Sequence, residues 1–115
     1  MLTEKLVITS ELVGDHAVRV LKLSGPILLS NLFDFQALVR SDDSAILVLD
    51  LSEVPYMDSA AVGCLVNAHV SRVNHHRHLA LAGVHDRVAT LMQATHIDQV
   101  LKTFPTVAEA LTVAR

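Results

Sequence analysis

Asp58 and Ser59 are the residues whose types and spacing offer this chain the clearest chemistry. Pro55 breaks the chain just before them and an apolar helical pattern follows over 59–74, which predicts Asp58 as the helix cap and Ser59 in the first turn. The backbone N–H groups of a first turn lack internal partners and carry the positive end of the helix dipole. A phosphate on Ser59 would occupy a favourable anion site and would add about −1.5 to −2 charges beside Asp58. Taken alone, this local physics favours a plainer alternative, in which Asp58 is only a cap and Ser59 only an exposed hydroxyl.

A second candidate surface is the apolar run Pro26-Ile27-Leu28-Leu29, which follows Gly25 at the end of a predicted strand. If this run is exposed beside Ser59, the candidate phosphorylation site, it would form an apolar docking rim for a partner. The alternative is that Ile27 and Leu29 pack under the helix that follows. The sequence leaves both interpretations open.

Histidines gather near the end of the 59–74 helix, where imidazoles could ligate zinc. They are His69, His75, His76 and His78, and Arg72, Arg77 and Arg87 add positive charge nearby. No carboxylate or second cysteine is interleaved with them, and basic groups complement the carboxyl end of a helix dipole. We therefore expect a solvated, mildly basic turn and no metal site.

Cys64 falls inside the 59–74 helix, where a buried structural thiol is the expected role. The four glycines form no phosphate-cradling loop, and no Ser-His-Asp arrangement can be read from the spacing. We therefore expect no catalytic residue, no cofactor and no enzymatic activity.

The chain has 115 residues, of which 51% are hydrophobic and 18% charged, and this balance predicts one folded domain over residues 1–115. The net charge of −3 and the scattered Lys and Arg residues argue against a nucleic-acid partner. One cysteine fits a reducing compartment. The first residues lack the pattern of a signal peptide, and no apolar run approaches the roughly 18–20 residues that span a bilayer. We expect a cytoplasmic protein without direct membrane insertion.

The hydrophobic pattern predicts strands and helices that alternate after an opening hairpin. The predicted strands cover residues 6–8, 17–23, 45–51, 79–82 and 100–101, with a turn over 11–15. The predicted helices run from a Ser30 cap to Arg40, over 59–74, over 86–94, and onward from a capping box of Thr106 and Glu109. The almost wholly apolar 45–51 run indicates a central strand buried on both faces. The order β-β-α-β-α-β-α-β-α predicts an α/β fold with a mixed sheet of four to five strands and about four helices.

A buried strand that leads into a Met-Asp-Ser helix start is the most informative pattern in the chain. It consists of Leu47-Val48-Leu49-Asp50-Leu51 and then Tyr56-Met57-Asp58-Ser59-Ala60-Ala61-Val62-Gly63. This pattern resembles the signature of STAS domains, in particular that of the bacterial anti-sigma factor antagonists. The segments 18–25 and 79–88 are similar to further parts of the family, so the resemblance covers nearly the whole chain and implies a single STAS domain.

The resemblance implies a regulatory protein that does no catalysis. In the unphosphorylated form this protein would bind an anti-sigma factor that is also a serine kinase. The kinase would phosphorylate Ser59, and the phosphorylated protein would then release the kinase. A serine phosphatase would reset the switch, and Asp58 would cap the helix and shape the surface that the kinase recognises. The partner-binding face is predicted to comprise Met57, Ala60, Ala61, Val62, Gly63, Pro26, Ile27, Leu28 and Ser30.

Two segments depart from the antagonist pattern. Ala60-Ala61 stands where Ser-Gly is frequent, and Gly25-Pro26 followed by apolar residues stands where many antagonists have Gly-Glu-Leu-Asp. The second departure resembles the loop of STAS domains attached to anion transporters. The alternative function is therefore a non-catalytic STAS subunit of a lipid or anion transport complex, which would bind its partner constitutively.

Overall fold

The computed structural model describes residues 5–13 and 17–113, whose helices and strands follow the predicted order. The strands are β1 (Val7–Val13), β2 (Val18–Ser24), β3 (Ile46–Glu53), β4 (His78–Ala82) and β5 (Lys102–Phe104). The α-helices are α1 (Phe33–Ser41), α2 (Ser59–Asn74), α3 (Asp86–Ala94) and α4 (Val107–Val113), and a short 3₁₀ helix is η1 (Ile97–Gln99). The predicted α/β fold class is confirmed.

The described strands join in one five-stranded sheet with the spatial order β1-β2-β3-β4-β5. β1 runs antiparallel to β2, whereas the β2–β3, β3–β4 and β4–β5 pairs are parallel. Parallel neighbours need crossover connections, which α1, α2 and α3 with η1 supply. Because the parallel strands share one direction, the loops that follow them gather at one end of the sheet.

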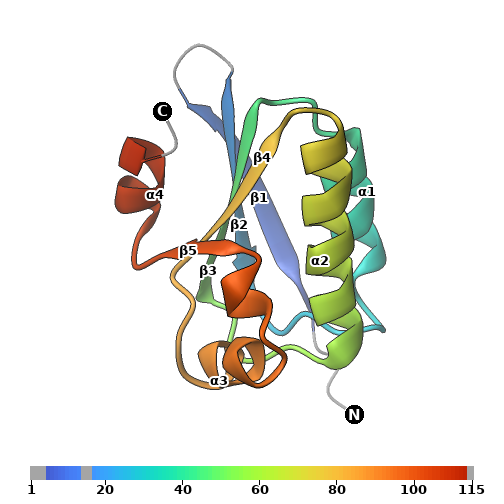
Figure 1. Cartoon of the computed structure of the whole chain (residues 1–115). Helices are drawn as coiled ribbons and strands as arrows, with labels where there is room; N and C mark the ends of the chain where they lie inside the picture. Colours follow the sequence, from blue (N-terminus) through green and yellow to red (C-terminus); the bar gives the residue numbers. More distant parts are fainter. Residues whose placement is uncertain (1–4, 14–16, 114–115) are drawn as a thin grey trace.

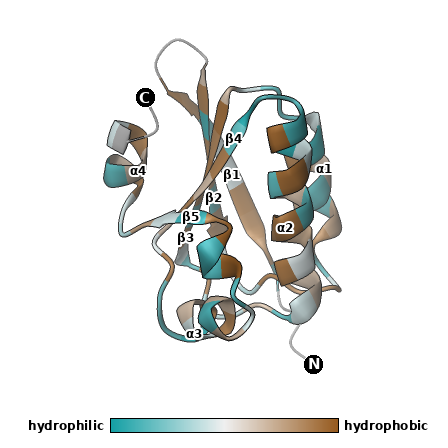
Figure 2. Ribbon diagram, in the orientation of Figure 1, coloured by the Kyte–Doolittle hydropathy of each residue, from teal (hydrophilic) through white to brown (hydrophobic). Residues whose placement is uncertain are grey.

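The central strand β3 alternates its side chains between two hydrophobic cores. Leu47, Leu49 and Leu51 are fully buried in the larger core, to which α1, α2 and α3 also contribute. Ile46 and Val48 face a smaller core that α4 closes from the other side. Figure 1 shows α1 and α2 on one face of the sheet and α4 on the other, and Figure 2 shows hydrophobic residues concentrated on the strands. Burial on both faces explains the almost unbroken apolar run.

None of the described helices combines the length and the apolar character needed to cross a membrane.

The turn that leaves β2 depends on Gly25. Its φ is +107°, in the region that favours glycine, and a Cβ there would collide with the backbone carbonyl of Lys5. The Gly25 N–H donates to the Glu53 carbonyl over 3.0 Å, so the ends of β2 and β3 stay attached. The chain is thereby directed into the 26–31 loop beside the end of β3.

The first strand is longer than predicted. The sequence predicts a strand over 6–8 and a turn over 11–15, but β1 extends to Val13 because antiparallel pairing with β2 satisfies the backbone groups on its inner side. The rest of the predicted turn, at 14–15, lies outside the described residues.

The last strand is displaced from the predicted 100–101 to Lys102–Phe104, where it pairs with β4. The preceding η1 completes a tight turn, and Leu101 is buried in the larger core. Leu101, the apolar residue behind the predicted strand, therefore anchors the turn that precedes β5.

α1 begins later than predicted. Ser30 is exposed within a turn and does not cap the helix, which starts at Phe33 with Leu32 at the N-cap position and no side-chain cap. The Asn31 N–H donates to the Leu28 carbonyl over 3.0 Å. This turn uses the residues that would otherwise form the first helical turn.

Arg72 is only 4% exposed, which contradicts its predicted place in a solvated basic turn. Its Nη1 donates to Asp42 Oδ2 over 3.0 Å and its Nε to the His78 carbonyl over 2.8 Å. Its Nη2 donates to the Ser44 carbonyl over 2.5 Å, and Arg19 Nε donates to Asp42 Oδ1 over 2.7 Å. This buried polar cluster attaches the end of α2 to β2 and to the segment before β3.

Candidate functional site

Two loops meet where β2 and β3 end, and they pair through their backbones. Ile27 and Met57 form an isolated parallel bridge. The Ile27 N–H donates to the Tyr56 carbonyl over 3.2 Å, and the Asp58 N–H donates to the Ile27 carbonyl over 3.3 Å. The structure therefore brings together the two segments that the sequence pattern singles out.

The Asp58 carboxylate both caps α2 and fastens the neighbouring loop. Its Oδ1 accepts from the Ala61 N–H over 3.0 Å, which is the predicted N-cap bond. Its Oδ2 accepts from the Leu29 N–H over 3.0 Å, across 29 positions of sequence. One side chain thus fixes the start of the helix relative to the apolar loop.

The same hydrogen bonds keep Asp58 ionised. The Leu29 N–H is the main cause that lowers the pKa of Asp58 below its ordinary value of 3.8, partial burial opposes it, and the N–H groups of Ala61 and Ala60 add to it. The site therefore carries a negative charge at neutral pH. A phosphate on a neighbouring residue would be a second anion at this position.

Ser59 is the first residue of α2 and is exposed to solvent. The first turn of this 16-residue helix contains no acidic residue, so its positive end is offset there mainly by the Asp58 cap. The position is accessible to a kinase and electrostatically able to hold a phosphate. Phosphorylation of Ser59 stays a prediction.

Asn31 fixes the shape of the loop that presents Leu29. Its Oδ1 accepts from the Leu28 N–H over 2.9 Å, and its Nδ2 donates to the Pro26 carbonyl over 2.9 Å. Sequence reasoning missed this role, although an Asn just after an apolar run is a familiar turn residue that bonds nearby backbone. The loop is therefore held from two sides, by Asn31 and by Asp58.

The residues predicted to form the partner-binding face differ in exposure. Buried in the larger core are Ile27, Met57, Ala61 and Val62. Half-buried are Pro26, Leu28 and Ala60, and exposed are Ser30 and Gly63. The buried side chains fill the space between the paired loops, the helices and the sheet, so they support the surface without forming it. Among the predicted residues, only the exposed and half-buried ones can touch a partner directly, and partner binding by them stays a prediction.

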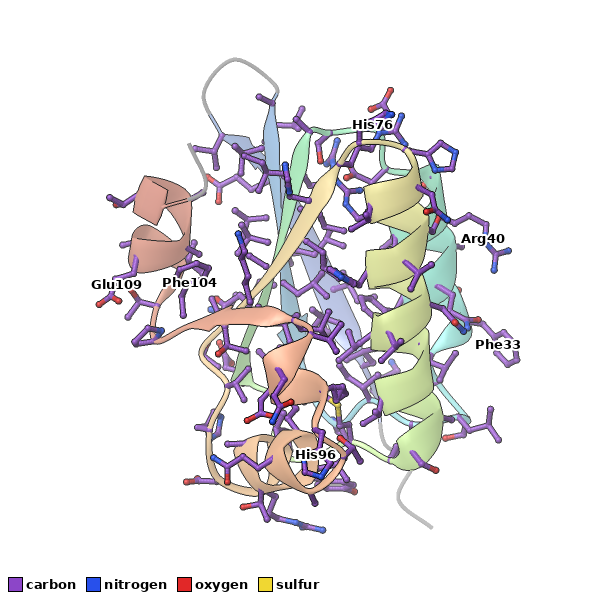
Figure 3. All side chains as sticks on the ribbon, in the orientation of Figure 1. Phe33, Arg40, His76, His96, Phe104 and Glu109 are labelled. Carbon is purple, nitrogen blue, oxygen red and sulfur yellow. The ribbon has the colours of Figure 1, made fainter. Side chains whose placement is uncertain are left out.

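Leu29 and Phe33 are the large apolar side chains that the loop and the start of α1 expose, at 61% and 69%. Figure 3 shows Phe33 projecting outward from α1. The apolar side chains of Leu32, Phe35 and Val39 are buried under the helix, and Phe33 falls outside that stripe. An aromatic residue off the apolar stripe was the available signal for this second exposed residue.

Cys64 occupies the buried place in α2 that the sequence predicts. Burial raises the pKa of the Cys64 thiol against weaker opposing effects of Gln36 and Arg40, so the thiol stays protonated at neutral pH. Within residues 5–13 and 17–113, no group of three or more His, Cys, Asp or Glu side chains is placed to hold a metal ion.

Known proteins resemble this chain in sequence pattern and in fold. The STAS domain family model matches residues 9–110. Solved structures with a similar fold include an anti-sigma factor antagonist from Mycobacterium paratuberculosis, with 21% identity, a TM-score of 0.82 and coverage of 94% of this chain and 92% of that chain. The anti-sigma factor antagonist SpoIIAA in its unphosphorylated form has 16% identity, a TM-score of 0.79 and coverage of 95% and 96%. A sulfate transporter family protein from Wolinella succinogenes has 20% identity, a TM-score of 0.72 and coverage of 85% and 84%.

The three structures are similar to this chain in fold. Because their sequence identities to it are low, they show a shared fold and not a shared function. The match to the family model is what assigns the family, because it extends from within β1 into α4 and includes the paired loops and the Asp58-capped helix start. This chain belongs to the STAS domain family.

Proposed function

We propose that this protein binds an anti-sigma factor that is also a serine kinase, and that phosphorylation of Ser59 releases the complex. The unphosphorylated chain is the binding form, a serine phosphatase restores it, and the chain itself does no catalysis. The observation that carries the proposal is the exposed Ser59 at the start of α2, next to a loop fastened by Asp58. STAS family membership and the fold likeness to anti-sigma factor antagonists support it.

The docking surface in this proposal consists of Leu29, Phe33, Asp58 and Ser59. Leu29 and Phe33 supply exposed apolar area, and aromatic residues are enriched at the centres of protein interfaces. Asp58 is ionised, and Asp34 adds an exposed carboxylate in the first turn of α1. The complementary partner surface is an apolar pocket whose hydrogen-bond donors match the single negative charge of Asp58, without further basic groups to pair a second anion at Ser59.

A phosphate on Ser59 would weaken this complex without a change of fold. It would place a second anion beside the ionised Asp58, and a partner that covers both groups would have to remove their hydration. The phosphate would also gain from the N–H groups at the start of α2 while the chain is free. Both effects favour the released form.

The phosphorylation step is tested by incubating the protein with ATP and the purified anti-sigma factor kinases of its native host. Peptide mass spectrometry is expected to map one phosphate to Ser59, absent in Ser59→Ala. The matched control is Ser71→Ala, because Ser71 is another exposed serine of α2 and its loss should leave the phosphate in place. No transfer by any of these kinases, or transfer to a different residue, would contradict the proposal.

The release step predicts that Ser59→Glu binds the cognate kinase at least about tenfold more weakly than the wild type, because a carboxylate is then added beside Asp58. Isothermal titration calorimetry measures the dissociation constant, and Ser71→Glu is expected to bind like the wild type because it changes the same charge farther along α2.

The second candidate is a non-catalytic STAS subunit of a lipid or anion transport complex that is bound constitutively. The exposed apolar Leu29 and the fold likeness to a sulfate transporter family protein favour it. Tight binding to a transport subunit that is equal for wild type, Ser59→Ala and Ser59→Glu would support this function over the switch.

A further inference from the structure

β1 forms an open edge of the sheet. Among the described residues its only strand partner is β2, in a register from Val7 with Ser24 to Val13 with Val18. The outward backbone groups of this seven-residue strand therefore face no described strand. β1 and β5 are the first and last strands in the order of the sheet, so they form its two edges. An open strand edge is a template for pairing with another strand.

The sequence of β1 carries few of the features that keep an edge unpaired. It contains no proline and no lysine, and Glu11 is its single charged residue. Val7 and Leu12 remain 54% and 43% exposed. The opposite edge strand, β5, is only three residues long and begins with Lys102. β1 is therefore the edge better suited to pairing.

The residue pattern of β1 is symmetric about Ser10. An antiparallel pair of two β1 strands with a two-fold axis at Ser10 keeps each residue type on one face of the sheet. The opposed residues would be Val7 with Val13, Ile8 with Leu12, Thr9 with Glu11, and Ser10 with Ser10. Apolar residues would meet apolar ones near both ends, and the Glu11 carboxylates would face Thr9 and not each other.

We propose that β1 is a self-association edge, through which two copies of this chain pair antiparallel about Ser10 into one continuous sheet. The partner is a second copy because the strand matches itself in apolar pattern and its single charge, Glu11, does not face its own copy. Pairing of one strand buries less area than a stable dimer interface, so a weak, concentration-dependent dimer is expected. The proposal is independent of the proposed function, since it involves neither Ser59 nor its docking surface.

Analytical ultracentrifugation of the full chain over a concentration series tests this dimer through substitutions at Thr9, which is exposed. Thr9→Lys places two Lys–Glu11 pairs across the two-fold axis, and Thr9→Glu places two like-charge pairs there. We expect the dissociation constant to fall about fivefold with lysine and to rise about tenfold with glutamate.

Stability of the monomer should change in the opposite sense, which separates association from folding. Within one chain Thr9 lies opposite Lys22, so glutamate would be favourable there and lysine unfavourable. Thermal unfolding of dilute protein measures this effect. As a register test, Ser10→Cys should form an intermolecular disulfide on mild oxidation, because the two positions meet at the axis.

The matched control uses Thr103 of β5, an exposed threonine on the opposite edge strand. Thr103→Lys and Thr103→Glu are expected to leave the dissociation constant unchanged. A wild-type chain that stays monomeric at millimolar concentration would overturn the proposal. So would Thr9→Lys and Thr9→Glu shifting association in the same direction, or a response confined to the Thr103 variants.

Discussion

Arg72→Met is expected to lower the free energy of unfolding by about 3–5 kcal/mol, because it removes the more deeply buried of the two guanidinium groups that pair with the Asp42 carboxylate. Arg72 is 4% exposed and Asp42 is 8% exposed, so water cannot replace the lost partner. The carbonyls of His78 and Ser44 would also lose the guanidinium donors that reach them over 2.8 and 2.5 Å. Unsatisfied buried acceptors add to the cost of the lost ion pair.

The ionisation state of Asp42 follows from the same cluster. Burial raises the pKa of Asp42, but the hydrogen bonds from Ser44 and Arg19 and the charge of Arg72 outweigh it and hold the pKa below the ordinary value. Asp42 is therefore an anion in the folded protein. Removal of Arg72 alone leaves the Asp42 anion with only Arg19 as a counter-charge. Removal of both Arg72 and Asp42 leaves no buried carboxylate to stabilise.

Urea unfolding of Arg72→Met, Asp42→Leu, the double variant of both and one control variant measures the effect. Arg40→Met is the matched control, since Arg40 projects outward from α1 and should change stability by less than about 0.5 kcal/mol. The double variant Arg72→Met with Asp42→Leu should recover part of the loss, because the buried carboxylate that Arg72 stabilised is then absent. Equal losses for Arg72→Met and Arg40→Met, or strict additivity in the double variant, would contradict this account.

The elements that local pattern determines were predictable from the sequence. The 45–51 and 79–82 runs are short and apolar because β3 and β4 are covered on both faces, and their pattern does not depend on distant residues. Asp58 as a helix cap follows in the same way, because its bond to the Ala61 N–H spans only three positions.

Features that depend on distant contacts could not be predicted in this way. Arg72 looks like a solvated helix residue until its partner 30 positions away is in place. Asp58 shows its cap in the sequence but not its second bond to Leu29. Ser30 has the right residue type for a cap, yet the Asn31 turn occupies that part of the chain. The partners of Arg72 and Asp58 lie outside the local window that sequence reasoning uses, whereas the Asn31 turn is local and its residue type was an available signal.

Asp58→Ala should lower the free energy of unfolding by about 1–2 kcal/mol, the usual cost of a lost N-cap. The loss has a second part, because the Leu29 N–H also loses its acceptor and the loop is then held through Asn31 and its backbone pairing. Hydrogen exchange at the Leu29 amide should therefore accelerate more than exchange in the sheet.

The pH dependence of stability gives an independent measure of the same contact. Because folding lowers the pKa of Asp58, its contribution is complete at neutral pH and is lost as the pH falls below 3.8 toward the folded-state pKa. Asp58→Asn cannot ionise, so the stability difference between the wild type and this variant should shrink on acidification through that range.

The matched control is Asp34→Asn, since Asp34 is an exposed first-turn acid of α1. A difference between the wild type and Asp58→Asn that stays constant across this range would mean that the Asp58 charge does not hold the loop. The docking surface would then depend for its arrangement on Asn31 and on the Ile27–Met57 bridge.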